Sequence, residues 1–347
     1  MGLTNHQILA FLNIKGLGLK TGFTLAEHAM NNELDFCNAN DLFDYFNMLR
    51  NKKIISRVKI ESLYDLKEAL KNAERLIEKS EEQGIKLVTF FDKDFPKRLR
   101  GLRNSKGNDE SPLVLWYKGN LSVSEMPSVA IIGTREPTNE GVKAGNYLGM
   151  RFAESGFNVV SGLAYGCDKS GHEGALLCTN GKTTAFLAHG LDTVYPNEHK
   201  YLADEIVERG GLLMSEYAIG TPGLANYFVA RDRLQSGLSD ACIVIQTGIA
   251  GGTLHAVRAT IANNKPLFAV EYKDEHVMSH PKVLGNKMLL EDGILVGNNL
   301  AKASRLVVSE LDNIIISLKN QDRLCSLSNQ DTKKNVVFTP IQTSLFD

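Results

Sequence analysis

The spacing of apolar and polar positions changes near residue 128. From there on, short apolar runs alternate with stretches long enough to form helices. The runs that we predict as strands are residues 129–133, 158–161, 184–188, 212–215, 241–247 and 266–272. Strands that alternate with helices form a parallel sheet with both faces covered. The pattern therefore predicts an α/β fold with a mostly parallel sheet, in which the loops that follow the strands share one edge.

The chain before residue 128 has a different pattern. Residues 63–84 place apolar side chains on one face and Glu and Lys on the other, which predicts a helix. Strand-like runs follow at 85–91 and 113–117, and a later apolar segment at 306–318 suits either a helix or a strand. We expect these parts: a helical N-terminal domain at 1–84, a lead-in segment that packs on the core at 85–127, the α/β core at 128–300, and a C-terminal helix with a mobile tail at 301–347.

The composition limits how a nucleic acid could be bound. The chain has 39 Lys and Arg against 40 Asp and Glu, with 43% hydrophobic residues. This excludes a polybasic protein that binds by bulk charge and a disordered acidic chain, so a polyanion would need a local, preformed site. The start of the chain lacks the pattern of a signal peptide, and no apolar run is long enough to span a bilayer. The five cysteines show no CxxC spacing, and we expect free thiols in the cytoplasm, without metal or disulfides.

A glycine, a threonine and an arginine directly follow the first core strand. Gly133 lets the backbone approach a ligand, and the helix that follows offers free N–H groups. Arg135 adds a guanidinium suited to a phosphate. The spacing is not GxGxxG, which disfavours NAD. A tight turn whose arginine points to solvent remains the alternative.

Two further glycine-containing loops follow strands of the same predicted sheet. Gly162 and Gly166 follow the second strand, and the segment 248–253 follows the fifth. Because these loops converge on one edge, together they favour a ligand of phosphate or nucleotide size. Asp168 and His172 are four residues apart, but no nucleophile accompanies them, so a simple N-cap is the better interpretation of Asp168 than a catalytic pair.

An aromatic residue and two arginines lie between the fourth and fifth core strands. Phe228 and Arg231 are three residues apart and would share a helix face, and Arg233 follows two residues later. Aromatic and arginine side chains together suit single-stranded nucleic acid, because bases stack and phosphates form ion pairs. The alternative is a core phenylalanine beside ordinary salt bridges.

The order of these motifs resembles the DNA-processing protein A (DprA/Smf) family across about 300 of the 347 residues. The core segments that carry the resemblance are VAIIGTREPT at 129–138, VVSGLAYGCD at 159–168, HGLDTVYPNEHKYLADEI at 189–206, LLMSEYAIGTP at 212–222, FVARDRLQSGLSDACIVIQ at 228–246, GGTLHAVRATIANNKPLFAV at 251–270 and LGNKMLLEDG at 284–293. Upstream, residues 73–102 and 113–121 resemble the family's lead-in, and 8–23 resembles its helix-hairpin-helix or SAM-like N-terminal segment.

The resemblance implies a Rossmann-like core that binds single-stranded DNA during natural transformation and helps to load the recombinase RecA. It implies a cytoplasmic protein, commonly a homodimer, without cofactor or catalytic turnover. The residues that it places at the DNA are Gly133, Arg135, Gly162, Gly166, Phe228, Arg231 and Arg233. To these we add the loop residues Thr134, Gly251, Gly252 and Thr253.

The sequence departs from the family pattern at several points. Thr134 replaces a serine, and Asp232 replaces an asparagine and so adds a negative charge beside the arginines. The glycine-rich loop at 251–253 resembles that of the related LOG phosphoribohydrolases, which keeps a nucleotide sensor or a phosphoribohydrolase open as the alternative function, although His255 lies near the place of their catalytic glutamate. Residues 301–347 are too few and too polar for the family's C-terminal winged helix.

Two more segments are specific to this chain. Residues 97–106 form a basic run that either extends a DNA track or is a solvated loop. The terminal QTSLF resembles the short peptide with which bacterial proteins dock on the DNA sliding clamp, so we predict partner contacts by Gln342, Leu345 and Phe346.

Overall fold

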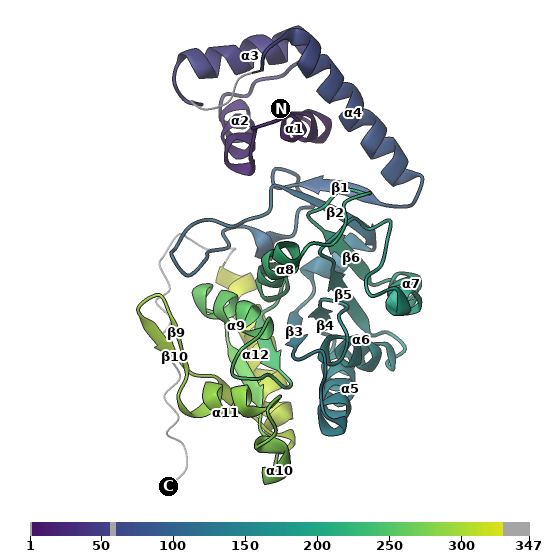
Figure 1. Cartoon of the computed structure of the whole chain (residues 1–347), viewed down its shortest axis with the longest axis vertical. Helices are drawn as coiled ribbons and strands as arrows, with labels where there is room; N and C mark the ends of the chain where they lie inside the picture. The colour runs from purple at the N-terminus through teal and green to yellow at the C-terminus, as the bar shows by residue number, and fades with distance from the viewer. Residues whose placement is uncertain (1, 56–59, 329–347) are drawn as a thin grey trace.

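The computed structural model describes residues 2–55 and 60–328. Its first four helices form a bundle at one end of the molecule, and the later elements build a large α/β domain (Figure 1). The helices of the bundle are α1 (Asn5–Leu12), α2 (Leu19–Asn31), α3 (Ala39–Asn51) and α4 (Leu63–Glu81). The side chains of Thr4, Asn38 and Ser62 cap three of them by accepting backbone N–H groups. Phe46 and Leu66 lie in the apolar interior that the bundle encloses.

One nine-stranded sheet forms the centre of the α/β domain, in the order β1-β2-β6-β5-β4-β3-β7-β8-β11. Its strands are β1 (Lys86–Thr89), β2 (Val114–Gly119), β3 (Ser128–Ile132), β4 (Asn158–Ser161), β5 (Lys182–Phe186), β6 (Leu212–Ser215), β7 (Ala241–Val244), β8 (Leu267–Val270) and β11 (Ser304–Leu306). Neighbouring strands from β6 to β11 are parallel, whereas β1 and β2 pair antiparallel. This confirms the predicted α/β fold with a mostly parallel, Rossmann-like sheet.

Helices cover both faces of the sheet, which explains why its strands are apolar on both sides. The helices are α5 (Asn139–Glu154), α6 (Cys167–Leu176), α7 (Lys200–Glu208), α8 (Ala225–Leu238), α9 (Thr253–Ala262), α10 (Glu275–Met278), α11 (Leu284–Glu291) and α12 (Leu311–Ser328). Along β3, Val129 and Ile131 pack in one cluster with α5 and α12. The alternate residues Ala130 and Ile132 pack in another cluster with α9 and α11.

Three segments differ from the expected pattern or add detail to it. Strands β1 and β2, from the lead-in segment, are hydrogen-bonded into the main sheet and do not merely pack on it. The segment 306–318, for which we expected either a helix or a strand, contains the last residue of strand β11 and the first residues of helix α12. A small hairpin of β9 (Ile294–Val296) and β10 (Asn299–Ala301) lies outside the main sheet. The proposed limits of the four parts of the chain stay a prediction.

The order of the strands creates a crevice at the carboxyl end of β3. From β3 the chain continues to β4, β5 and β6 on one side, and it then returns to β7 on the other side of β3. Loops that leave β3 and β7 therefore diverge over opposite halves of the sheet. Ligands of open α/β sheets bind at such a switch point.

Candidate nucleic-acid interface

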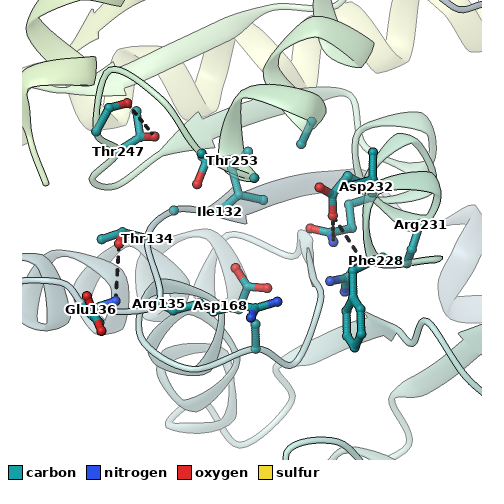
Figure 2. Close-up of a pocket in the computed structure, with 18 of the residues that line it drawn as sticks. Ile132, Thr134, Arg135, Glu136, Asp168, Phe228, Arg231, Asp232, Thr247 and Thr253 are labelled. Atoms are coloured by element: carbon teal, nitrogen blue, oxygen red, sulfur yellow. Dashed lines mark hydrogen bonds and ion pairs between the residues drawn. The ribbon is translucent and has the colours of Figure 1, made fainter. Parts of the chain in front are cut away.

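A cavity of about 750 Å³ lies at this switch point. The loops that follow β3, β4 and β7 line it, together with α8, as the close-up in Figure 2 shows. The predicted site residues that line it are Gly133, Thr134, Arg135, Phe228, Arg231, Gly251, Gly252 and Thr253. The three loops that we predicted to share one edge of the sheet thus meet at a single cavity.

Arg135 lies at the cavity with its side chain exposed. The loop that carries it is held to the sheet, because Thr134 donates its backbone N–H to the Gln246 carbonyl oxygen at 2.7 Å. The guanidinium carbon lies 5.6 Å from the centre of the Phe228 ring, a cation–π contact. Within the described part of the chain, the Arg135 side chain makes no hydrogen bond or ion pair. Its charge is therefore available to a ligand.

Two aromatic side chains lie side by side at the cavity. Phe228 is half-buried in the first turn of α8, and its ring centroid lies 5.7 Å from that of Tyr195. Tyr195 comes from the loop after β5 and is 56% exposed. Tyr195 was not among the predicted site residues, although an aromatic residue in a loop on the ligand-binding edge was a signal that could have identified it.

The loop between β7 and α9 forms the open wall of the cavity. A Cβ atom built on Gly251 or Gly252 would meet no atom within 4 Å, so a ligand can approach this backbone closely. Among the described residues, no group accepts the backbone N–H of Gly251, Gly252 or Thr253. These donors lie at the positive end of the α9 dipole. The base of the loop is held in place, since Asn286 Oδ1 accepts the Thr247 N–H at 2.8 Å.

The other three predicted glycines approach protein atoms, which changes their interpretation. A Cβ on Gly162 would collide with the Arg231 guanidinium, and one on Gly133 with the Cys167 side chain. Gly166 has a φ of 74° and packs against the loop after β3. Gly162 and Gly166 do not line the main cavity. These glycines are thus needed to pack the loops together, and of the predicted glycines only Gly251 and Gly252 leave open space beside their backbone.

The two arginines of α8 have different environments, and this corrects the expectation that both face a strand. Arg231 is 4% exposed, and its Nη1 donates to the Phe186 carbonyl oxygen at 2.6 Å. Arg233 does not line the cavity, because its two terminal nitrogens bind the Glu216 carboxylate at 2.7 Å each. Residues two apart point to different sides of a helix, so one helix cannot direct both at the same ligand. Arg231 supports the floor of the cavity, and Arg233 ties α8 to the loop after β6.

Three carboxylates also line the cavity, namely Glu136, Asp168 and Asp232, and none was predicted as a site residue. Glu136 is paired with Lys282. Asp168 is 6% exposed and accepts the Gly162 N–H at 3.1 Å, and burial raises the pKa of its carboxyl group. Burial likewise raises the pKa of Asp232 to about 7, against the opposing effect of Arg231. Asp168 follows the first residue of α6 and is not its N-cap, which is Gly166.

Asp168 and His172 are not hydrogen-bonded to each other. The His172 Nε2 atom accepts the Leu163 N–H at 3.3 Å, and its Nδ1 lies 2.6 Å from the Thr183 hydroxyl. Burial lowers the pKa of His172 to about 3, so the ring is neutral. His172 is therefore engaged by Leu163 and Thr183 and does not form a pair with Asp168.

The basic run at 97–106 lies away from the cavity and is engaged by neighbouring groups. Arg98 binds Asp240 at 2.8 Å, and Arg100 lies over the ring of Phe90. These contacts favour the interpretation of the run as part of the packing around α8. The clamp-like Gln342, Leu345 and Phe346 lie outside the described residues.

Two other kinds of site are absent from the described residues. No helix among residues 2–55 and 60–328 is long and apolar enough to cross a membrane. In the same part of the chain, no three His, Cys, Asp or Glu side chains are grouped so that they could hold a metal ion. The cysteines at 37, 167, 178 and 242 are free thiols.

Comparison with known proteins identifies relatives of this architecture. Residues 86–305 match the family model of DNA recombination-mediator protein A. The chain is 30% identical to Protein Smf of Synechocystis over 247 residues, which are 70% of this chain and 59% of that protein. This chain thus spans only about half the length of the curated relatives that it matches.

Two solved structures are similar to large parts of the chain. DNA processing protein A of Streptococcus pneumoniae superposes with a TM-score of 0.68 at 24% identity, over 90% of this chain and 98% of that one. DNA processing protein A of Helicobacter pylori, whose single-stranded DNA binding mode has been described, matches with a TM-score of 0.55 at 28% identity. That match covers 68% of this chain and 96% of the other. Since the family model spans the sheet from β1 to β11, the chain belongs to the DNA recombination-mediator protein A family.

Proposed function

We propose that this chain binds single-stranded DNA in the cavity beside β3 and acts as a recombination mediator. The observation that carries the proposal is the Arg135 guanidinium, which lies over Phe228 at the cavity without an ion-pair partner among the described residues. A free cation beside an aromatic ring is suited to a strand, because phosphates bind the one and bases stack on the other. The family membership and the DNA-binding relative from Helicobacter pylori support it.

The cavity residues differ in the part of the strand that they are suited to bind. Arg135 and the free N–H groups of Gly251, Gly252 and Thr253 hold phosphate oxygens. Phe228 and Tyr195 provide ring faces for bases. Arg231 acts indirectly, because its guanidinium is engaged by the Phe186 carbonyl beneath the cavity.

An exchange of Arg135 for alanine tests this assignment. We expect Arg135→Ala to weaken binding of an oligothymidylate by about tenfold or more in a mobility-shift titration, since a charge-assisted contact contributes roughly 1.5–3 kcal/mol. Arg305→Ala is the matched control, because Arg305 is exposed on the edge strand β11 and pairs with Glu271. Unchanged affinity of a folded Arg135→Ala variant would remove this loop from the DNA site.

The biological role that we infer is non-enzymatic and follows the family. We propose that the chain acts in the cytoplasm as a homodimer and delivers strands to RecA during natural transformation. We further propose that Gln342, Leu345 and Phe346 bind the sliding clamp. Pull-down of RecA and of the clamp by the full chain, and by a chain without residues 342–347, tests both partners. Only the clamp interaction should depend on the truncation.

A second candidate function is a sensor or phosphoribohydrolase for mononucleotides. The open backbone of Gly251 and Gly252 favours it, because such a loop can hold a free phosphate as well as one in a strand. Release of a base from nucleoside monophosphates would support this alternative. Under the single-strand proposal, no base is released, and the melting temperature responds to oligonucleotides.

A further inference from the structure

A second cavity adjoins the main cavity at the switch point. Its volume is about 590 Å³, and it is lined by the loop after β3 and by residues of α5 and α6. Arg135 and Glu136 line both cavities, so the two share one wall. Gly166, a predicted site residue that does not line the main cavity, lines this second one. A ligand that extends past Arg135 can therefore continue into the second cavity.

Tyr165 contributes an aromatic ring to the second cavity. Its hydroxyl donates to Glu198 Oε2 at 2.8 Å, and its ring centroid lies 4.9 Å from that of His199 in an edge-to-face contact. His199 is itself buried, and its Nδ1 atom lies 2.8 Å from the Leu163 carbonyl oxygen. Neighbouring groups thus hold the Tyr165 ring in place, while 42% of the residue stays exposed. A ring that is already fixed loses little conformational freedom when a base stacks on it.

The charged groups of the second cavity leave one cation available to a phosphate. Lys169 pairs with Glu173 at 3.5 Å, and Glu136 pairs with Lys282. Among the described residues that line the second cavity, only Arg135 carries a charge without an ion-pair partner. Each phosphate of a strand joins two nucleosides. A phosphate held by Arg135, where the two cavities meet, therefore has one nucleoside on the side of each cavity.

Resting on the proposed binding of single strands, we infer that the second cavity holds the next nucleotide of the same strand, with its base stacked on Tyr165. The volume of the cavity is within the range of about 300–1,000 Å³ that is typical of small-molecule sites, so one nucleotide fits. Every base has a face that can stack on an aromatic ring. This subsite therefore adds affinity and directs the path of the strand without selecting a sequence.

Two labelled strands of equal length separate stacking from phosphate binding. One is an oligothymidylate, and the other is a wholly abasic strand, which keeps the phosphates and lacks the bases. Fluorescence anisotropy measures the affinity of each strand for the wild-type chain and for Tyr165→Ala. We expect Tyr165→Ala to bind the oligothymidylate about fivefold or more weakly and the abasic strand within about twofold of wild type, because only the stacked base is lost. Tyr64→Ala, exposed on α4 of the helical bundle, should leave both affinities unchanged.

Tyr165→Phe distinguishes stacking from a purely structural contact. The phenylalanine keeps the ring and loses the hydroxyl that binds Glu198. We expect this variant to bind the oligothymidylate nearly as tightly as the wild-type chain does. If Tyr165 only ties the loop after β4 to Glu198, the phenylalanine variant will bind as weakly as the alanine variant, and the inference is then wrong.

The outcomes separate this inference from the function on which it rests. A wild-type chain that binds neither strand would contradict both. Two results would contradict the second subsite alone, provided that thermal unfolding shows a folded Tyr165→Ala variant. One is unchanged affinity of this variant for the oligothymidylate, and the other is an equal loss of affinity for both strands. A loss that is confined to the strand with bases, and that phenylalanine prevents, supports the inference.

Discussion

At the scale of single residues, Gly162 and Arg231 determine each other's positions. The guanidinium of Arg231 occupies the space in which a side chain at position 162 would lie. From there it donates to the Phe186 carbonyl oxygen and lies near Asp168 and Asp232, so a buried cation is surrounded by acceptors. A glycine in a strand-to-helix loop suggests contact with a ligand, yet here it makes room for an arginine.

We expect Gly162→Ala to destabilise the fold strongly. The added methyl group would displace Arg231 from Phe186 and leave a buried charge without its partner, a loss on the order of 3–5 kcal/mol. Denaturant unfolding measures the change. Gly252→Ala is the control, because Gly252 has a φ of −59° and open space beside it, so its stability should stay within about 0.5 kcal/mol of wild type. A Gly162→Ala variant as stable as this control would contradict our account of the glycine.

At the scale of elements, α8 connects the site to the core. Its first residues, 225–230, are exposed or half-buried and three of them line the cavity, whereas six of the eight residues 231–238 are buried. The helix therefore enters the molecule end-on and has no single apolar stripe. This arrangement explains why residue spacing alone suggested a shared face for Phe228 and Arg231 but did not reveal that Arg231 is buried and Arg233 is paired.

The end of α8 is held by a half-buried lysine, Lys265. Lys265 Nζ donates to the carbonyl oxygens of Ser236, at 3.1 Å, and Ser239, at 2.7 Å, and also to that of Gly237. The Ser236 carbonyl also accepts the Ser239 N–H at 3.3 Å, so the lysine matters most for the carbonyls of Gly237 and Ser239 at the helix end. The lysine thus fixes the helix that carries Phe228 and Asp232.

We expect Lys265→Met to lower the free energy of unfolding by about 2–3 kcal/mol, since it removes hydrogen bonds from a charged donor and leaves buried carbonyl groups unpaired. Thermal unfolding followed by circular dichroism measures this effect. Lys287→Met, on the exposed side of α11, should cost less than about 0.5 kcal/mol. If both variants unfold at the same temperature, the lysine does not stabilise the end of the helix.

At the scale of the whole molecule, the charges nearly cancel, with 39 positive and 40 negative side chains. Many of the basic groups outside the cavity are paired, as Arg98 is with Asp240 and Arg151 with Asp312. The proposed strand binding would then depend on a few groups at one cavity and not on a positive surface. This distinguishes the molecule from proteins that coat nucleic acid through many lysines.

The dependence of strand binding on salt should accordingly be shallow. With one phosphate neutralised by Arg135, the slope of log K against log salt concentration should be roughly −0.7, which is the contribution of each neutralised phosphate on a single strand. Anisotropy titrations over a range of sodium chloride concentrations measure the slope. A slope steeper than about −5 would indicate a far more extensive basic track than the cavity provides.

Much of the fold follows from local patterns. The alternation of short apolar runs and helices predicted the parallel sheet, because strands buried on both faces must be apolar throughout. The glycine-ended strands predicted the edge at which ligands bind, and there the structure brings together Arg135, Phe228 and the loop at 251–253. The placement of β1 and β2 in the same sheet was not predictable, since strand pairing is a long-range property.

The sequence by itself determined the fold class, the edge of the sheet that carries the site and the residue types at that edge, because these depend on periodicity and chain direction. Only the tertiary structure decided which side chains are free to act. It left Arg135 unpaired among the described residues, buried Arg231 beneath the cavity, bound Arg233 to Glu216 and opened Asp232 toward the cavity. The physical reason is that the partner of each charge comes from a distant part of the chain, so its availability is settled by packing and not by its neighbours in sequence.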